Sequence, residues 1–298
     1  MNSQIGTIGV VGLGVMGREM ARHLRADSCA VLGLDVDPGV WAGNDLGGIE
    51  RAESLAELAA RAQLLVLSLP GPAQVERVLD DIVKIGVSDL IIADTSTVDP
   101  HSAERFTRTA AASGLIYAQC PVIGGQTGAR QGTLTVIAGV ADSGRSALAE
   151  VLPRIGREIH WVDSPAQAAT LKLLNNLVSL GNTLVFAEAF ALGAKAGISA
   201  ARVYEVLRTG SAQSTAMDRR WGVNIGPGNY HPGFTIDLAL KDLRLAGRYA
   251  QEVGVPLLHG SLTAQVYQLL AARGWGGRDV AAIVPWWEEI IETRIGGV

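Results

Sequence analysis

A glycine-rich turn between an apolar run and a helix-like run most limits what this chain can fold into. The segment Gly12-Leu13-Gly14-Val15-Met16-Gly17 follows the apolar residues 5–11 and precedes a helix-like stretch at 18–25. In a β-turn-α-β unit the first glycine permits a tight turn, the second admits a pyrophosphate against bare backbone, and the third lets helix and strand pack closely. Phosphates then bind at the helix N-terminus, where unpaired N–H groups favour anions. All six residues are therefore predicted to contact a dinucleotide.

An acidic residue at the end of the next apolar run indicates which dinucleotide. Asp35 follows the run 29–34, where a carboxylate can accept hydrogen bonds from the adenosine ribose hydroxyls. The same carboxylate repels a 2′-phosphate, and no arginine lies within 35–38 to bind one. We expect NAD in preference to NADP. The alternative is that Asp35 and Asp37 only shape the turn before Pro38.

Composition excludes several classes of protein. The chain has 298 residues, 48% of them hydrophobic, which is enough for two domains with ordinary cores. A net charge of -4 and only 5% aromatic residues argue against a nucleic-acid partner. Two cysteines, Cys29 and Cys120, suit a reducing compartment better than a disulfide framework. We see no secretion signal, no apolar run of membrane-spanning length and no paired histidines for a metal, so we expect a cytoplasmic protein without a metal.

The two halves of the sequence have different patterns. Short apolar runs at 7–11, 30–34, 64–69, 90–94, 116–119 and 134–138 alternate with helix-like segments such as 54–62 and 73–84. This alternation predicts an α/β Rossmann-type domain over 1–163, with a doubly wound, mostly parallel sheet. Helix formers then run almost unbroken over 167–196, and further helices are expected at 200–208, 235–253 and 257–272. An all-α domain over 164–298 is therefore expected, joined to the first domain by the long helix.

Ligands of such sheets bind beyond the carboxyl ends of the strands, so the residues that follow the strands are candidates. Leu69 and Pro70 follow one predicted strand, and Ser96 and Thr97 follow another. Ordinary loop and N-cap chemistry is the alternative for each of them.

Lys172 and Asn176 are one helical turn apart, so they share a face of the long helix. Lys172 has apolar neighbours on both sides in the sequence. Desolvation and the positive ring of an oxidised nicotinamide would lower the pKa of this lysine, so that it could act as a general base. Asn176 could orient the substrate or the lysine. The alternative is a lysine whose stem covers apolar surface while its ammonium stays in water.

Several ordered motifs together resemble the β-hydroxyacid dehydrogenase family over nearly the full length of the chain. They are the glycine turn, Asp94-Thr95-Ser96-Thr97, Pro121-Val122-Ile123-Gly124-Gly125, Gly132-Thr133-Leu134-Thr135, Lys172-Leu173-Leu174-Asn175-Asn176, and Phe234 with Lys241-Asp242-Leu243. The resemblance implies hydride transfer between NAD and a small β-hydroxy acid or its semialdehyde.

The resemblance also implies individual roles. Lys172 would be the general acid/base, Asn176 a substrate contact, and Lys241 a residue near the nicotinamide. Ser96 or Thr97 would contact the cofactor. The substrate loop would include Val122, Ile123, Gly124 and Gly125, whose glycine N–H groups can bind a carboxylate, and Asn175 would be a further substrate-binding residue.

One position departs from the family. The family's substrate loop usually has a serine where this chain has Ile123. Either the backbone amides suffice and Ile123 narrows the pocket, or the substrate has a less polar body than usual. An NADPH-dependent imine reductase or reductive aminase is the alternative enzyme, although Lys172 and Asp35 count against it; an NAD-binding sensor without turnover is the alternative outside enzymes.

Assembly is expected to be a homodimer or homotetramer, as in relatives. Trp275, Trp286 and Trp287 either cover a subunit interface or belong to the core of the monomer. The expected partner is a small hydroxy acid or aldehyde, with no nucleic acid or membrane.

Overall fold

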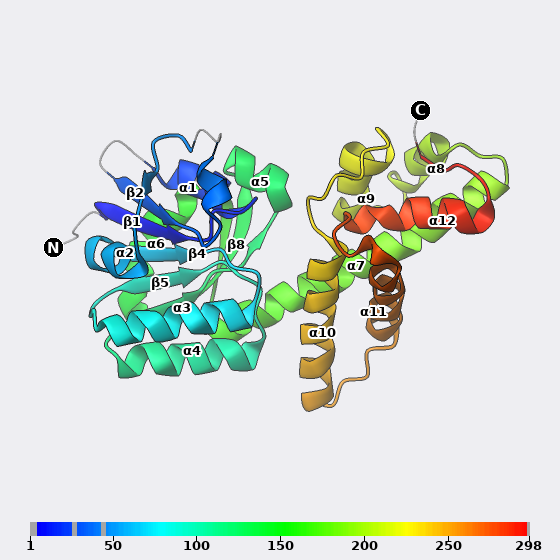
Figure 1. Cartoon of the computed structure of the whole chain (residues 1–298). Helices are drawn as coiled ribbons and strands as arrows, with labels where there is room; N and C mark the ends of the chain where they lie inside the picture. Colours follow the sequence, from blue (N-terminus) through cyan, green and yellow to red (C-terminus); the bar gives the residue numbers. More distant parts are fainter. Residues whose placement is uncertain (1–4, 26–28, 43–45, 297–298) are drawn as a thin grey trace. The chain divides into compact units, whose positions relative to one another are not determined.

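The computed structural model describes residues 5–25, 29–42 and 46–296, which fall into two compact units, Met1–Lys172 and Leu173–Val298 (Figure 1). The division lies within helix α7, Pro165–Lys195, whereas the sequence analysis placed it just before this helix.

The first unit contains a mostly parallel sheet. Its described strands are β1 Thr7–Val11, β2 Ala30–Leu34, β3 Glu50–Arg51, β4 Leu64–Leu67, β5 Ile91–Asp94, β6 Ile116–Gln119, β7 Val122–Ile123, β8 Leu134–Gly139 and β9 Gly156–Val162. They follow the order β3-β2-β1-β4-β5-β6-β8-β7, with β9 also paired to β8. Pairing is parallel from β3 to β6 and antiparallel where β8 meets β6 and β7. The predicted α/β architecture is confirmed.

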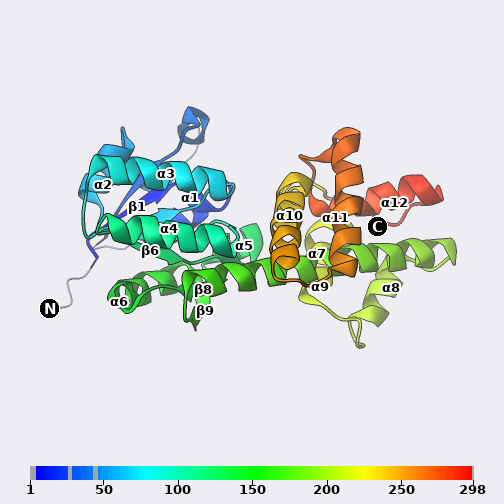
Figure 2. The same cartoon turned by 90° about the horizontal axis from the view of Figure 1, so that it is seen from below.

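Helices cover both faces of this sheet. They are α1 Gly17–Leu24, α2 Leu55–Arg61, α3 Pro72–Ile85, α4 Pro100–Ala112, α5 Gly125–Gln131 and α6 Asp142–Val151. Strand residues alternate between two cores: Leu64 and Val66 of β4 pack with α1 and α6, while Leu65 and Leu67 pack with α2, α3 and α4. Figure 2 shows α3 and α4 side by side on the latter face.

The order of the strands determines where a ligand can bind. The chain runs outward from β1 through β2 to β3, then returns to the other side of β1 with β4. The carboxyl ends of β1, β2, β4, β5 and β6 lie at one edge because these strands are parallel. A doubly wound sheet binds ligands at this edge, beside the point where the strand order reverses.

The second unit is helical in its described residues. After α7 come α8 Ala200–Leu207, α9 Thr215–Arg220, α10 Ile236–Glu252, α11 Leu258–Leu270 and α12 Ile283–Ile291. Helix α7 begins with a reciprocal cap, since Gln167 N–H donates to Ser164 Oγ (3.2 Å) and Asp163 N–H donates to Gln167 Oε1 (3.2 Å). The helical domain expected from the sequence is therefore present.

The core of the second unit is rich in aromatic side chains. Tyr204 stacks on Trp221 with ring centroids 4.6 Å apart. Trp275, Trp286 and Trp287 are partly buried against the same core. Of the two alternatives left open by the sequence, packing within the chain's own core accounts for their burial.

Asp279 connects three segments of the second unit. Its buried carboxylate accepts hydrogen bonds from the N–H groups of Gly233 (2.9 Å) and Phe234 (3.0 Å), from Ala281 N–H (2.9 Å) and from Arg220 Nη1 (3.3 Å). Its backbone also forms an antiparallel bridge with Thr235, the N-cap residue of α10. One carboxylate therefore joins the end of α9, the start of α10 and the approach to α12.

Among the described helices, α7 alone is long and apolar enough to span a membrane by length and composition, with a mean hydropathy of 1.5 over its most apolar window. The expectation that no run of this kind exists is corrected, because alanine, leucine and valine outweigh the scattered polar residues. Core helices of globular proteins meet the same criterion, and Ala169, Phe186 and Phe190 of α7 are buried in the two cores.

Candidate active site

The glycine turn after β1 leaves backbone accessible at one position and is closely packed at two others. Gly12 has φ of 90°, and a Cβ there would lie 2.3 Å from Ser68 O. A Cβ on Gly17 would lie 1.9 Å from Gly12 O, so α1 could not begin where it does with any larger residue. A Cβ on Gly14 would meet nothing within 4 Å. Close packing thus explains Gly12 and Gly17, and open space at Gly14 fits a cradle for a pyrophosphate.

Asp35, directly after β2, supports this turn. Its Oδ2 accepts a hydrogen bond from Leu13 N–H at 2.6 Å, and its Oδ1 accepts one from Asp37 N–H at 2.8 Å. Asp37 in turn caps the short helical turn Pro38–Trp41 through Gly39 N–H (2.8 Å). Both aspartates therefore shape the turn before Pro38, and the Asp35 carboxylate also lies against the predicted nucleotide loop.

Two further loops at the same edge are joined to each other. Ser96, after β5, accepts a hydrogen bond at its Oγ from Leu69 N–H, after β4, at 2.9 Å. Ser96 is only 5% exposed, so its hydroxyl serves this contact, whereas Thr97 is half-buried. The structure brings these predicted cofactor residues together at the expected edge.

The predicted general base, Lys172, lies against the predicted substrate loop within the first unit. Lys172 is half-buried, and its Nζ donates a hydrogen bond to Val122 O at 2.8 Å. Val122 and Ile123 form β7, and the turn that follows has φ of 132° at Gly124 and 61° at Gly125. These left-handed values suit glycine and occur at the N-cap and the first residue of α5. The lysine is therefore bonded to the strand residue two positions before the glycine pair.

A second group of predicted residues lies within the helical unit. Asn176 Nδ2 donates to Asp242 Oδ2 at 2.6 Å, and Asn175 Nδ2 donates to Asn176 Oδ1 at 3.0 Å. Lys241 Nζ lies 2.9 Å from the other oxygen, Asp242 Oδ1. Asp242 is 3% exposed, and this buried carboxylate fixes the amide of Asn176. Asp242 stands in the Lys241-Asp242-Leu243 motif but was not predicted as a site residue, and its adjacency to Lys241 is the only signal in the sequence.

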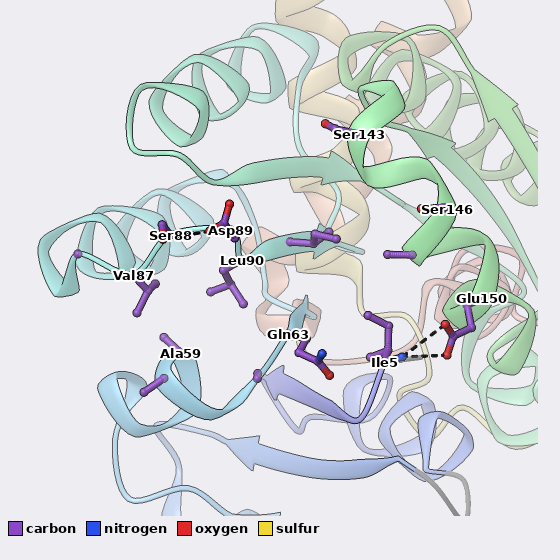
Figure 3. A pocket seen from close by; sticks show the side chains of 15 residues that line it. Ile5, Ala59, Gln63, Val87, Ser88, Asp89, Leu90, Ser143, Ser146 and Glu150 are labelled. Atoms are coloured by element: carbon purple, nitrogen blue, oxygen red, sulfur yellow. Dashed lines mark hydrogen bonds between the residues drawn. The ribbon is translucent and has the colours of Figure 1, made fainter. Parts of the chain in front are cut away.

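A cavity of about 850 Å³ lies at a different part of the first unit (Figure 3). Gln63, Leu90 and Ile5 line it, and these residues precede β4, β5 and β1. Glu150 accepts hydrogen bonds there from Ile5 N–H at 3.3 and 3.4 Å. The cavity is therefore at the amino ends of the strands, opposite to the edge that carries the glycine turn.

Both cysteines are buried, which leads to a chemical prediction. Burial, and secondarily the Asp94 carboxylate, raise the pKa of the Cys120 thiol well above its usual range. Because the thiolate is the reactive form, a native sample should resist a thiol reagent such as dithionitrobenzoate, and Cys29 and Cys120 should both react after unfolding in guanidinium. Rapid modification of Cys120 in the native protein would contradict its placement in the core.

Comparison with known families gives two adjoining matches. Residues 7–163 match the NAD binding domain of 6-phosphogluconate dehydrogenase, and residues 166–287 match the NAD-binding domain of NADP-dependent 3-hydroxyisobutyrate dehydrogenase. With the glycine cradle and Asp35 at the carboxyl edge, they define the class as NAD(P)-binding dehydrogenases that act on hydroxyl groups. The chain belongs to the β-hydroxyacid dehydrogenase family, whose members include the 3-hydroxyisobutyrate dehydrogenases.

Individual relatives agree with this assignment. The 2-(hydroxymethyl)glutarate dehydrogenase of Eubacterium barkeri is 31% identical over 97% of this chain and 97% of its own length. The mitochondrial 3-hydroxyisobutyrate dehydrogenase of Mus musculus is 28% identical over 95% of this chain and 87% of its own. Among solved structures, Mycobacterium tuberculosis 3-hydroxyisobutyrate dehydrogenase with L-serine superposes with a TM-score of 0.84 at 27% identity, covering 95% of this chain and 99% of that one. Relatives are thus dehydrogenases of small hydroxy acids.

Proposed function

We propose that the protein transfers a hydride between NAD and a small β-hydroxy acid or its semialdehyde, with Lys172 as the general acid/base. The observation that carries the proposal is the hydrogen bond from Lys172 Nζ to Val122 O, at 2.8 Å, two residues before Gly124. An amine held beside backbone that can bind a carboxylate is the arrangement that oxidation of a hydroxy acid requires.

Different residues have separate roles in the proposed reaction. When bound, the nicotinamide supplies the electron chemistry by accepting or donating the hydride at C4. Lys172 in its neutral form removes the hydroxyl proton of the substrate, and in the reverse direction its ammonium form protonates the carbonyl oxygen. The carbonyl of Val122 orients the lysine, and Asp242 orients Asn176, which contacts the substrate. The open backbone at Gly14 would hold the pyrophosphate, and Gly12 and Gly17 allow the close packing that shapes this turn.

The substrate is proposed to carry one carboxylate and a body that is partly apolar. The N–H groups of Gly124 and Gly125 are proposed to donate hydrogen bonds to the substrate carboxylate. The half-buried apolar side chain of Ile123 belongs to the residue directly before them. Substrates with a methyl or methylene group next to the hydroxymethyl carbon should pack against Ile123 better than substrates with a second hydroxyl.

The test is formation of NADH at 340 nm from a panel of hydroxy acids and simple alcohols, with NAD+ and NADP+ in parallel. The panel includes 3-hydroxyisobutyrate, 2-(hydroxymethyl)glutarate, glycerate and a plain alcohol without a carboxylate. Turnover of 3-hydroxyisobutyrate with NAD+, and none of the plain alcohol, is the expected result. If none of these compounds yields NADH, and the protein instead oxidises NADPH when a cyclic imine is added, the proposal is overturned in favour of an imine reductase.

Coenzyme choice yields a separate prediction at Asp35. Asp35→Asn removes the negative charge and keeps one side-chain oxygen for Leu13 N–H, while its amide nitrogen replaces the oxygen that accepts from Asp37 N–H. Loss of charge repulsion should reduce the ratio of kcat/KM for NAD+ over NADP+ by about tenfold, equivalent to about 1.4 kcal/mol. The matched control is Asp37→Asn in the adjacent turn, which should leave the ratio unchanged; an equal change in both variants would locate the preference elsewhere.

A further inference from the structure

Four polar side chains are buried together where β5 and β6 end. Asp94 and Gln119 are 0% exposed, Tyr117 is 3% exposed and Ser96 is 5% exposed. Buried polar groups cost free energy unless they form hydrogen bonds, and all four do. Burial and the adjacent Asp94 carboxylate raise the pKa of Tyr117, so its hydroxyl remains protonated. Of these four residues, Ser96 alone is a predicted cofactor contact.

Gln119 has only one orientation that its surroundings accept. Its Nε2 donates to two backbone carbonyls, Ser96 O at 2.8 Å and Asp94 O at 3.2 Å. Carbonyl oxygens only accept hydrogen bonds, so the nitrogen must face them and Oε1 must face the Tyr117 hydroxyl, which lies 2.6 Å away. The Tyr117 hydroxyl is also 2.7 Å from Asp94 Oδ2, so its single hydrogen is shared between these two acceptors.

The network connects the two loops that carry site residues. On one side, Asp94 Oδ1 accepts a hydrogen bond from Ser96 N–H (2.9 Å), and Ser96 Oγ accepts one from Leu69 N–H. On the other side, Gln119 begins the segment that leads through Cys120 and Pro121 to Val122, whose carbonyl holds Lys172. Gln119 is thus bonded to the loop that carries Ser96 and Thr97, called the cofactor loop below, and it lies three residues before Val122, which accepts the hydrogen bond of Lys172.

We propose that Gln119 and Tyr117 are positioning residues that fix the cofactor loop at Ser96 relative to the Val122 segment, and so fix Lys172 relative to the nicotinamide. The part of this proposal that concerns Lys172 rests on the proposed function. An apolar pair of similar volume would also fill this core, but it would not tie the Ser96 carbonyl to the end of β6. A shift of about 1 Å between reacting groups can lower a rate about 100-fold, so the tie has a measurable consequence.

Gln119→Glu is the main test because it preserves shape and leaves at most one hydrogen, on a protonated carboxyl, for the two carbonyls that the amide nitrogen serves. The dissociation constant of NADH, read by fluorescence titration, should rise about tenfold. The kcat for the hydroxy acid should fall about 100-fold with a larger primary deuterium isotope effect, while KM for the hydroxy acid changes little. Tyr117→Phe, a milder change, should shift NADH affinity and kcat in the same direction and serves if Gln119→Glu does not fold.

Two matched variants distinguish positioning from a general effect on the fold. Gln63→Glu retains the oxygen that accepts from Gly6 N–H (2.6 Å) and Thr7 N–H (3.2 Å), and should leave NADH affinity and kcat unchanged. Tyr204→Phe removes the hydroxyl bonded to Asp218 (3.0 Å) in the helical unit and should do the same. Wild-type NADH affinity and kcat in both Gln119→Glu and Tyr117→Phe, with only a lower unfolding midpoint, would overturn the proposal.

The affinity measurement separates this inference from the proposed function. If the wild-type protein oxidises no hydroxy acid, the proposed reaction fails, yet weaker NADH binding by both variants would still support positioning of the cofactor loop. Unchanged NADH binding in that case would overturn the inference as well.

Discussion

Lys172→Ala is expected to lower kcat for the hydroxy acid about 1,000-fold, within the range that general acid/base groups contribute. The substitution removes the only group proposed to take the hydroxyl proton, while the glycine turn and Asp35 remain intact. The NADH dissociation constant from fluorescence titration should therefore stay near that of the wild type. Stopped-flow measurement of the first turnover will show that the proton-coupled hydride step, rather than product release, has slowed.

Three comparisons sharpen this prediction. Lys172→Arg keeps a positive charge but cannot lose its proton, so it should be nearly as impaired as the alanine variant. Lys195→Ala, an exposed lysine at the end of the same helix, should behave as wild type. Added methylamine should restore part of the activity of Lys172→Ala. Unimpaired turnover by Lys172→Ala would show that this lysine does not perform acid/base catalysis.

Gly14→Ala is expected to weaken NADH binding by at least about tenfold without changing the stability of the protein. The added methyl group would meet no protein atom within 4 Å, so the fold accommodates it. It would instead project from the backbone that is proposed to approach the pyrophosphate. Isothermal titration with NADH and thermal unfolding without ligand together provide the test.

Gly17→Ala is the comparison for this variant because its defect has a different cause. Its Cβ would lie 1.9 Å from Gly12 O, so the turn must shift, and overpacking of this kind costs about 1–3 kcal/mol. We expect a lower unfolding midpoint and loss of NADH binding together. Normal NADH affinity in Gly14→Ala would mean that the phosphates do not approach this backbone.

Much of the first unit could be predicted from its sequence because its strands are short continuous apolar runs. Three of the six predicted strands, β1, β2 and β6, have the predicted bounds, and the other three differ by one or two residues at an end. The strands β3, β7 and β9 were missed for physical reasons. β3 and β7 have two residues each, too few for a pattern, and charged residues such as Arg157 and Glu158 interrupt β9.

The candidate site was predictable where local spacing determines it. The glycine turn, Asp35 and the Lys172–Asn176 spacing are local, so the sequence could single these residues out, and their roles stay predictions. Contacts between distant segments were not predictable. The bond between Lys172 and Val122 joins residues 50 apart, and that between Asn176 and Asp242 joins residues 66 apart. Sequence periodicity carries no information on such contacts.

The carboxylate of Asp279 has a consequence for how the chain is completed during synthesis. All strands of the first unit precede residue 163, so its sheet can pair while the remainder is still being translated. The N–H groups of Gly233 and Phe234, in contrast, cannot form their hydrogen bonds until Asp279 has been synthesised, 46 and 45 residues later. A chain that ends before this residue would lack the acceptor that joins α9 to α10. Its first unit could fold, while its helical unit would stay incompletely folded and be exposed to cellular quality control.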